Sequence, residues 1–175
     1  MWMRKICVIN QKGGVAKTTT TINLATALAV NEKRVLIIDL DPQGNIGTCL
    51  CVQGEKTIYD LLINDADPYD CIVNVSENLD VITSDSSLAK AELIMAGMTS
   101  RETVVRRKLE PIFNYDYIII DCPPSLSLLK INALLYANEP FVPVSTDLLA
   151  LDALKKMSQT ISEINELFDH DIKIT

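Results

Sequence analysis

The residues best suited to chemistry lie in one short segment, residues 10–19, in which two adjacent glycines precede a lysine and a threonine. Glycine allows a backbone to approach a ligand closely, and the N–H groups of such a loop can surround a phosphate. A lysine can reach the terminal phosphates of a nucleotide, and a threonine hydroxyl can bind Mg²⁺. The segment therefore predicts a phosphate-binding loop whose contacts come from Gly13, Gly14, Val15, Ala16, Lys17 and Thr18.

The segments on either side of this loop predict a strand and a helix. Residues 6–9 form a short apolar run, which is typical of a strand buried on both faces. After the loop, Ile22, Ala25 and Ala29 recur at helical spacing. The glycines thus lie where a buried strand turns into a helix. The N-terminus of a helix attracts anions through its free N–H groups and its dipole.

The loop departs from the common phosphate-loop pattern G-x-x-x-x-G-K-[ST]. Gln11 and Ala16 stand where that pattern has glycine, and an additional lysine, Lys12, precedes the glycine pair. A cation inside the loop can neutralise charge that develops on a transferred phosphoryl group, as an arginine finger does. The alternative is an ordinary glycine turn with solvated lysines.

Three aspartates are expected at the same edge of the sheet as this loop. Asp39 and Asp41 lie at the end of a second apolar strand, residues 34–39, and Asp121 ends a third, residues 117–121. A strand–helix–strand unit at this spacing has parallel strands, and ligands bind at their carboxyl ends. Asp121 therefore fits the acid that holds Mg²⁺, directly or through water. The alternative for Asp121 and Asp39 is a turn or capping role.

Three motifs follow one another in the chain: the modified loop, Asp-Leu-Asp-Pro-Gln-Gly-Asn at residues 39–45, and Ile-Ile-Ile-Asp-Cys-Pro-Pro at residues 118–124. With them the chain resembles the ParA/Soj chromosome- and plasmid-partition ATPases, which have a deviant Walker A loop and are relatives of MinD and of the nitrogenase iron protein. The resemblance runs from Lys5 to the end of the chain. It implies an α/β P-loop NTPase fold, in which helices flank both faces of a mostly parallel twisted sheet.

The resemblance also implies one ATPase domain over residues 1–175 that lacks the C-terminal third of the family. That third normally supplies the base pocket and much of the DNA-binding surface. The implied activity is Mg²⁺-dependent ATP hydrolysis, coupled to formation of an ATP-bound sandwich homodimer. The implied partners are a ParB-like, DNA-bound adaptor protein and nonspecific DNA. No membrane is expected.

The resemblance assigns roles to individual residues of the site. Asp41 would position or activate the attacking water, and Lys17 would neutralise the terminal phosphates. Lys12 would reach the nucleotide of a second subunit and act there in catalysis. Thr19 would contact the α-phosphate. The residues expected around the metal are Thr18, Asp39 and Asp121.

Two other functions remain open at this stage. One is a MinD-like positioning ATPase on a membrane, although residues 42–45 favour partition. The other is a fragment that binds a nucleotide without hydrolysing it. ATP turnover distinguishes the fragment from a partition switch, and anionic liposomes test the membrane alternative.

Composition restricts the class of protein. The chain has 175 residues, 48% of them apolar, and a net charge of −7. These values indicate one globular domain and argue against strong nucleic-acid binding by this chain. No signal peptide or apolar run long enough for a membrane span is recognised, which predicts a soluble, cytoplasmic protein.

The spacing of the cysteines and of the basic residues predicts no additional binding site. The spacing of the five cysteines suits no zinc site or metal cluster, so buried free thiols are expected. The basic residues concentrate at Arg101, Arg106, Arg107 and Lys108, with glutamates around them. This arrangement indicates a solvated helix face.

The remaining elements are predicted from periodicity and turn residues. The helices expected are residues 57–62, 86–95, 100–113, 127–137 and 148–168, the last with a core face at 151, 154, 157, 161, 164 and 167. Short strands are expected at residues 71–73, 79–82 and 141–144, with a polar loop at 65–70 and a further strand starting at 171. Residues 145–147 receive no role.

Overall fold

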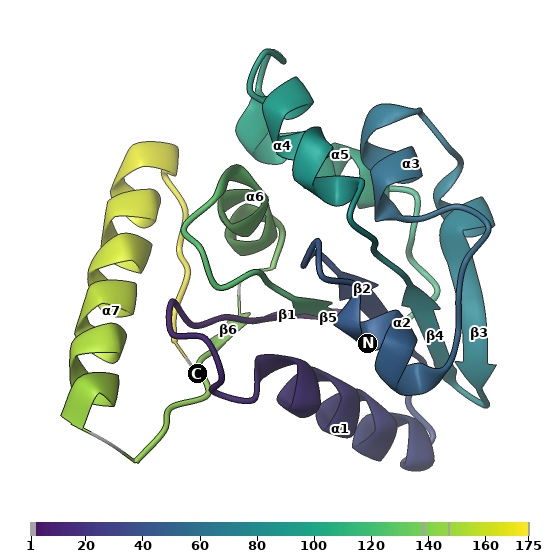
Figure 1. Cartoon of the computed structure of the whole chain (residues 1–175), viewed down its shortest axis with the longest axis horizontal. Coiled ribbons are helices and arrows are strands. Elements are labelled where there is room, and N and C mark those ends of the chain that lie inside the picture. The colour runs from purple at the N-terminus through teal and green to yellow at the C-terminus, as the bar shows by residue number, and fades with distance from the viewer. Residues whose placement is uncertain (1–2, 138, 147, 175) are drawn as a thin grey trace.

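A computed structural model describes residues 3–137, 139–146 and 148–174. Over these residues a six-stranded sheet forms the centre of the molecule, in the order β3-β4-β2-β5-β1-β6 (Figure 1). All neighbouring strands are parallel except β3 and β4, which confirms the predicted mostly parallel sheet. The strands are β1 Arg4–Val8, β2 Val35–Asp39, β3 Ile72–Ser76, β4 Leu79–Ile82, β5 Tyr117–Asp121 and β6 Glu139–Phe141.

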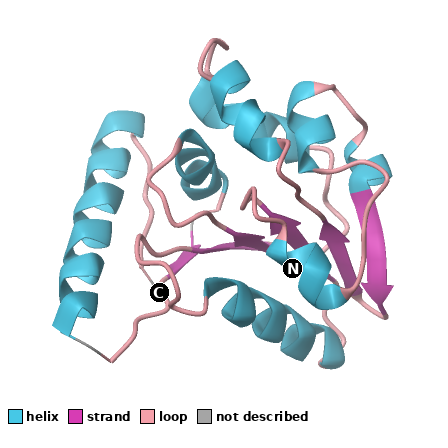
Figure 2. Cartoon of the chain, viewed as in Figure 1, coloured by secondary structure: helices cyan, strands magenta, loops and turns pink. Residues whose placement is uncertain are grey.

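Helices cover both faces of this sheet, as expected. Helix α1 lies on one face, and α3 to α6 lie on the other (Figures 1 and 2). The helices are α1 Lys17–Val30, α2 Asn45–Leu50, α3 Ile58–Ile63, α4 Leu88–Met95, α5 Val104–Leu109, α6 Leu128–Tyr136 and α7 Leu148–Phe168. Short 3₁₀ turns occupy Pro68–Cys71 and Arg101–Thr103.

The central strands read as unbroken apolar runs because both of their faces are buried. In β2, Leu36 and Ile38 point to the core shared with α3 to α6, whereas Val35 and Ile37 point to the core under α1. Successive side chains of a strand face opposite sides of a sheet, so a strand between two helical layers needs apolar residues at every position. β5 has the same pattern.

A helix and a strand differ most from their predicted bounds, and the polar loop at 65–70 is partly helical. The helix predicted at 100–113 is a 3₁₀ turn followed by α5, which ends before Pro111 because proline lacks the N–H that a continuing helix needs. The strand predicted at 141–144 lies earlier in the chain, at Glu139–Phe141, and it contains Pro140, which is tolerated because β6 is an edge strand. Residues 68–70 belong to a 3₁₀ turn capped by the Asp67 carboxylate, which accepts the Tyr69 N–H at 2.9 Å.

The C-terminal part corrects two further predictions. Helix α7 has the predicted bounds, but Leu151 and Leu167 of its expected core face are 58% and 77% exposed. Its described buried face is formed by Ala150, Met157, Thr160, Ile161 and Ile164. Residues 171–174 form no strand. The Asn165 side chain instead accepts the Ile172 N–H at 2.9 Å and donates to the Ile172 carbonyl at 3.0 Å.

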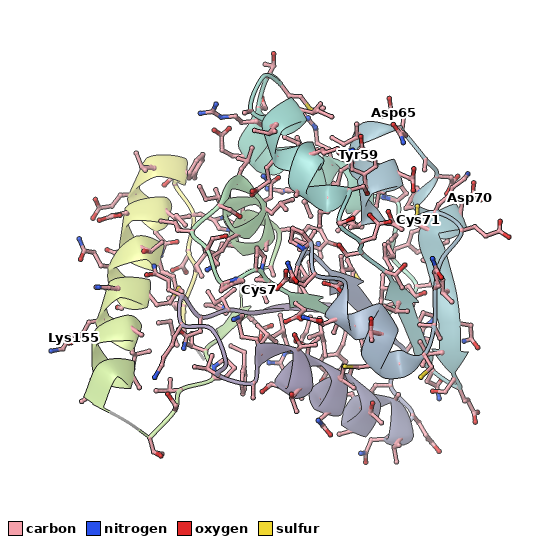
Figure 3. The ribbon with its side chains drawn as sticks, viewed as in Figure 1. Cys7, Tyr59, Asp65, Asp70, Cys71 and Lys155 are labelled. Carbon is pink, nitrogen blue, oxygen red and sulfur yellow. The ribbon has the colours of Figure 1, made fainter. Side chains whose placement is uncertain are left out.

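The cysteines are only partly as expected. Cys7, Cys71 and Cys122 are buried, but Cys49 and Cys51 are exposed because α2 is a short surface helix. Figure 3 shows Cys7 near the middle of the sheet and Cys71 toward the β3 edge. The described residues contain no cluster of His, Cys, Asp or Glu arranged to hold a metal. None of the described helices is long and apolar enough to cross a membrane.

Candidate functional site

The carboxyl ends of three adjacent strands bring the predicted site residues together. In the parallel register, Asp121 at the end of β5 lies beside Val8 of β1 and beside Asp39 of β2. The glycine loop follows β1 directly, and the Asp41 turn follows β2. Residues more than a hundred positions apart therefore meet at one edge of the sheet, as the parallel topology predicts.

The glycine loop has the conformation of an open anion cradle. Gly14 has φ +72°, and a Cβ at Gly13 or Gly14 would meet no atom within 4 Å. Ala16, at φ 59°, precedes α1 and supplies no side-chain cap to it. The N–H groups of the first turn of this 14-residue helix thus have no capping side chain, which suits a bound phosphate.

The two lysines of the loop differ in their surroundings. Lys17 is buried, and its Nζ donates to the carbonyl oxygen of Lys12 at 3.4 Å. The Nζ of Lys12 donates to the Ser145 hydroxyl at 3.3 Å, and the Lys12 N–H donates to Asn10 Oδ1 at 2.9 Å. Sequence reasoning assigned no role to residues 145–147, and no local pattern links Ser145 to a loop 133 positions away. Asp147 lies outside the described residues.

Asp121 and Thr18 form the part of the site suited to a divalent cation. The Thr18 hydroxyl donates to Asp121 Oδ2 at 2.6 Å, and the Thr21 hydroxyl approaches Oδ1 at 3.3 Å. Burial raises the pKa of Asp121 to about 6, whereas the hydrogen bond from Thr18 acts in the opposite direction. Thr21 was missed from sequence, although its position three residues after Thr18 places both on one helix face.

Asp39 organises the turn that follows β2. It is fully buried, its Oδ1 accepts the Asp41 N–H at 2.9 Å, and its Oδ2 accepts the Ile46 N–H at 3.2 Å. Burial raises its pKa to about 7, the two backbone hydrogen bonds lower it, and Asp121 adds to the increase. These contacts favour the turn-forming alternative, while the metal role of Asp39 stays a prediction.

Asp41 lies at the rim of the same turn. Its Oδ1 accepts the Gln43 N–H at 3.0 Å, and its carbonyl accepts the Gly44 N–H at 3.0 Å. The side chain is 9% exposed. The turn thus holds the Asp41 carboxylate in one place, and its charge adds to the increase in the pKa of Asp121. The water-positioning role of Asp41 stays a prediction.

A buried lysine behind the site was not foreseen. Lys130 in α6 is fully buried, and its Nζ donates to the Pro124 carbonyl at 2.8 Å. Burial lowers its pKa to about 8. Pro124 lies in the segment that follows Asp121, so Lys130 fastens that segment to α6. The helical pattern of residues 127–137 does not distinguish this lysine from a solvated one.

Glycines and a lysine at the start of a helix, beside a threonine–aspartate pair at the end of a parallel strand, define a P-loop nucleotide-binding protein. A family model described as "AAA domain" matches residues 3–174. The sporulation initiation inhibitor protein Soj of Bacillus subtilis is 45% identical over 174 residues, covering 97% of this chain and 69% of Soj.

Two further comparisons agree with this class. The chromosome partitioning protein ParA of Myxococcus xanthus is 42% identical, and the match covers 98% of this chain and 62% of ParA. Cobyrinic acid a,c-diamide synthase of Mycobacterium smegmatis, solved with an ATP analogue and magnesium, superposes with a TM-score of 0.92 at 34% identity. That superposition covers 99% of this chain and 72% of the synthase. The chain belongs to the ParA/Soj family of partition proteins.

Proposed function

We propose that this chain is a Mg²⁺-dependent, ATP-binding and ATP-hydrolysing switch of the DNA-partition type. The observation that carries the proposal is the Thr18–Asp121 hydrogen bond of 2.6 Å, at the point where the glycine cradle passes into α1. A hydroxyl and a carboxylate in contact beside a cradle that leaves open space at both glycines suit a metal-bound triphosphate. A solved structure of similar fold that was crystallised with an ATP analogue and magnesium supports the same ligands.

Some residues of the site would bind the nucleotide, and others would act in its hydrolysis. The N–H groups from Gly13 to Thr19 would hold the phosphates, and Lys17 would neutralise their terminal charge. Thr18 and Asp121 would hold Mg²⁺, which supplies charge neutralisation on the phosphate oxygens. Asp41 would orient the attacking water, since it is the carboxylate fixed at the rim of the site.

The dimeric part of the proposal concerns Lys12. Gly13 and Gly14 are exposed, so the cradle is open on the side of these two glycines, which follow Lys12 directly in the sequence. A second subunit covering this side would bury the nucleotide and receive Lys12 in trans. In a partition role, the partners of that dimer would be a ParB-like, DNA-bound adaptor and nonspecific DNA, and the protein would act in the cytoplasm. A MinD-like membrane role and a non-hydrolysing role are the alternatives.

Calorimetry and ATP turnover on the same samples test the proposal. Lys17→Ala removes the charge at the terminal phosphates, so ATP·Mg²⁺ binding should weaken by at least about a hundredfold, which corresponds to about 2.7 kcal/mol. Asp41→Ala should bind ATP nearly as the parent does and lose at least about tenfold in turnover.

Lys90→Ala is the matched control, because Lys90 is an exposed lysine of α4. It should leave binding and turnover unchanged. If Lys17→Ala bound ATP·Mg²⁺ as tightly as the parent does, residues 10–19 would not be the phosphate-binding loop. Binding without turnover in the parent would leave the non-hydrolysing alternative, and turnover that needs anionic liposomes would favour the membrane alternative.

A further inference from the structure

A second cavity lies at the opposite edge of the sheet from the nucleotide cradle. It has a volume of about 500 Å³ and is bounded by the start of β1, the end of α5 and the end of α6, which are labelled in Figure 1. Lys5 is the second residue of β1, and Tyr136 is the last residue of α6. The cradle follows the carboxyl ends of the strands, whereas this cavity lies at their amino ends.

Positive charge collects around this cavity in a chain whose net charge is −7. Lys5, Arg106 and Arg107 line it, and the carboxylate that lines it belongs to Glu110. Over the described residues, neither Arg106 nor Arg107 has a carboxylate oxygen within 4.0 Å. Both arginines are exposed, in agreement with the expected solvated face, and they also line this cavity.

The other two members of the basic group are neutralised. Arg101 pairs with Glu102 at 3.0 Å, and Lys108 forms an ion pair with Asp65. Both residues lie outside the lining of the cavity. The two arginines without an ion-pair partner among the described residues, Arg106 and Arg107, are thus the two that line the cavity. A bound anion would supply the counter-charge for both.

The pair of Lys5 and Tyr136 gives a second observation on the wall of the cavity. Tyr136 lines the cavity and is 6% exposed. Its hydroxyl oxygen has less than 1 Å² of exposed surface, so other atoms of the side chain form its part of the wall. The Nζ of Lys5 lies 4.2 Å from the centroid of the Tyr136 ring, which holds this cation at the wall of the cavity.

The cavity also has an apolar side. Leu109 and Ile112 are buried in its lining, and Phe113 at its rim is 77% exposed. Arginine forks suit phosphate oxygens, and an aromatic side chain suits an apolar or planar body. We propose that this cavity binds a small phosphate monoester with an apolar or aromatic body, the phosphate lying among Lys5, Arg106 and Arg107.

Phenyl phosphate is the probe, and its binding is measured by calorimetry on the Lys17→Ala chain so that the nucleotide cradle does not contribute. Arg106→Gln and Arg107→Gln should each weaken binding by at least about tenfold, equivalent to about 1.4 kcal/mol. Tyr136→Phe keeps the ring and removes a hydroxyl that has no exposed surface, so it should bind phenyl phosphate as tightly as the Lys17→Ala background does. Phenol, which lacks the phosphate, should not bind.

Lys108→Gln removes the same charge from the same helix outside the cavity and should bind phenyl phosphate as tightly as its Lys17→Ala background does. The proposal would be overturned if both arginine variants bound phenyl phosphate as tightly as the Lys17→Ala background does. It would also be overturned if Lys108→Gln lost as much affinity as the arginine variants, or if phenol bound as tightly as phenyl phosphate. Folding of each variant is checked by its urea midpoint. The site does not depend on the proposed ATPase function, and ATP turnover in the parent reports on that function separately.

Discussion

At the scale of single residues, the site is a group of buried charges held by short polar contacts. Asp39 and Asp121 are buried carboxylates whose pKa values are raised by burial, and Lys130 is a buried cation whose pKa is lowered for the same reason. Each is retained because a hydrogen-bond partner offsets part of its desolvation. These residues keep the loops in place before any ligand arrives, which reduces the ordering cost of binding.

Lys130 makes stability depend on pH in a defined direction. Its folded pKa of about 8 is below the ordinary lysine value, so between those two values the unfolded chain binds more protons than the folded chain. The contribution of Lys130 to the free energy of unfolding should therefore rise with pH above about 8, by at most about 1.4 kcal/mol per pH unit. Urea unfolding of the parent and of Lys130→Met at several pH values from 7 to about 10 gives this difference.

The control is Lys155→Met, because Lys155 projects from the outer face of α7 (Figure 3). Its difference from the parent should not change over the same pH range. A pH-independent difference for Lys130→Met would show that Lys130 has an ordinary pKa in the folded chain.

At the scale of elements, the turn between β2 and α2 passes close to the end of a neighbouring strand. Gly44 has φ +62°, and a Cβ there would lie 2.6 Å from the carbonyl oxygen of Ser84, which follows β4. This position of the turn therefore has no room for a side chain. The phosphate loop also contains glycines, but Gly13 has open space where a Cβ would lie.

These two glycines should respond differently to alanine. Gly44→Ala should lower the free energy of unfolding by about 2–4 kcal/mol, from a left-handed backbone and a clash with a backbone atom. Gly13→Ala should change stability by less than about 1 kcal/mol and weaken ATP binding, since its methyl group would occupy the space a phosphate needs. Urea unfolding and calorimetry measure both. Equal stability losses in the two variants would contradict this division.

At the scale of the whole molecule, the proposed function needs a second subunit. The Lys12 side chain contacts Ser145 within its own chain at 3.3 Å, and both residues are half-buried. A lysine that acts in trans must leave this contact when the dimer forms. A nucleotide that favours the dimer would then be the agent that moves Lys12.

Mixing variants tests whether Lys12 acts across the dimer. Lys12→Ala should bind ATP as a monomer but lose nucleotide-dependent dimerisation and turnover. Asp41→Ala retains Lys12 and should be inactive by itself. Mixing the two should restore part of the activity, because one site of the mixed dimer combines an intact Asp41 with an intact Lys12. Light scattering and turnover measure this, and the absence of rescue at any ratio, with turnover intact in Lys12→Ala alone, would leave Lys12 as an ordinary lysine.

Local sequence by itself determined the sheet class and most of the residues that the structure brings together at the strand ends. Neighbouring residues alone predict three features: the glycines before Lys17 and Thr18, the apolar strand that ends in Asp121, and the bounds of α7. Parallel topology then places the strand ends together. Local patterns suffice here because backbone periodicity and turn chemistry act over a few residues.

Tertiary structure alone decided which side chains meet across the fold. Several features depend on contacts between separate elements. They are the partners of Lys12 and Lys130, the turn role of Asp39, the exposed side of α7, and the position of Lys5 beside Arg106 and Arg107. A helix pattern shows how often apolar residues recur, but burial depends on which neighbour packs against each position. Packing buries Lys130 of α6 and leaves Arg106 and Arg107 of α5 around an open cavity. The helical periodicity of the sequence does not distinguish these two environments.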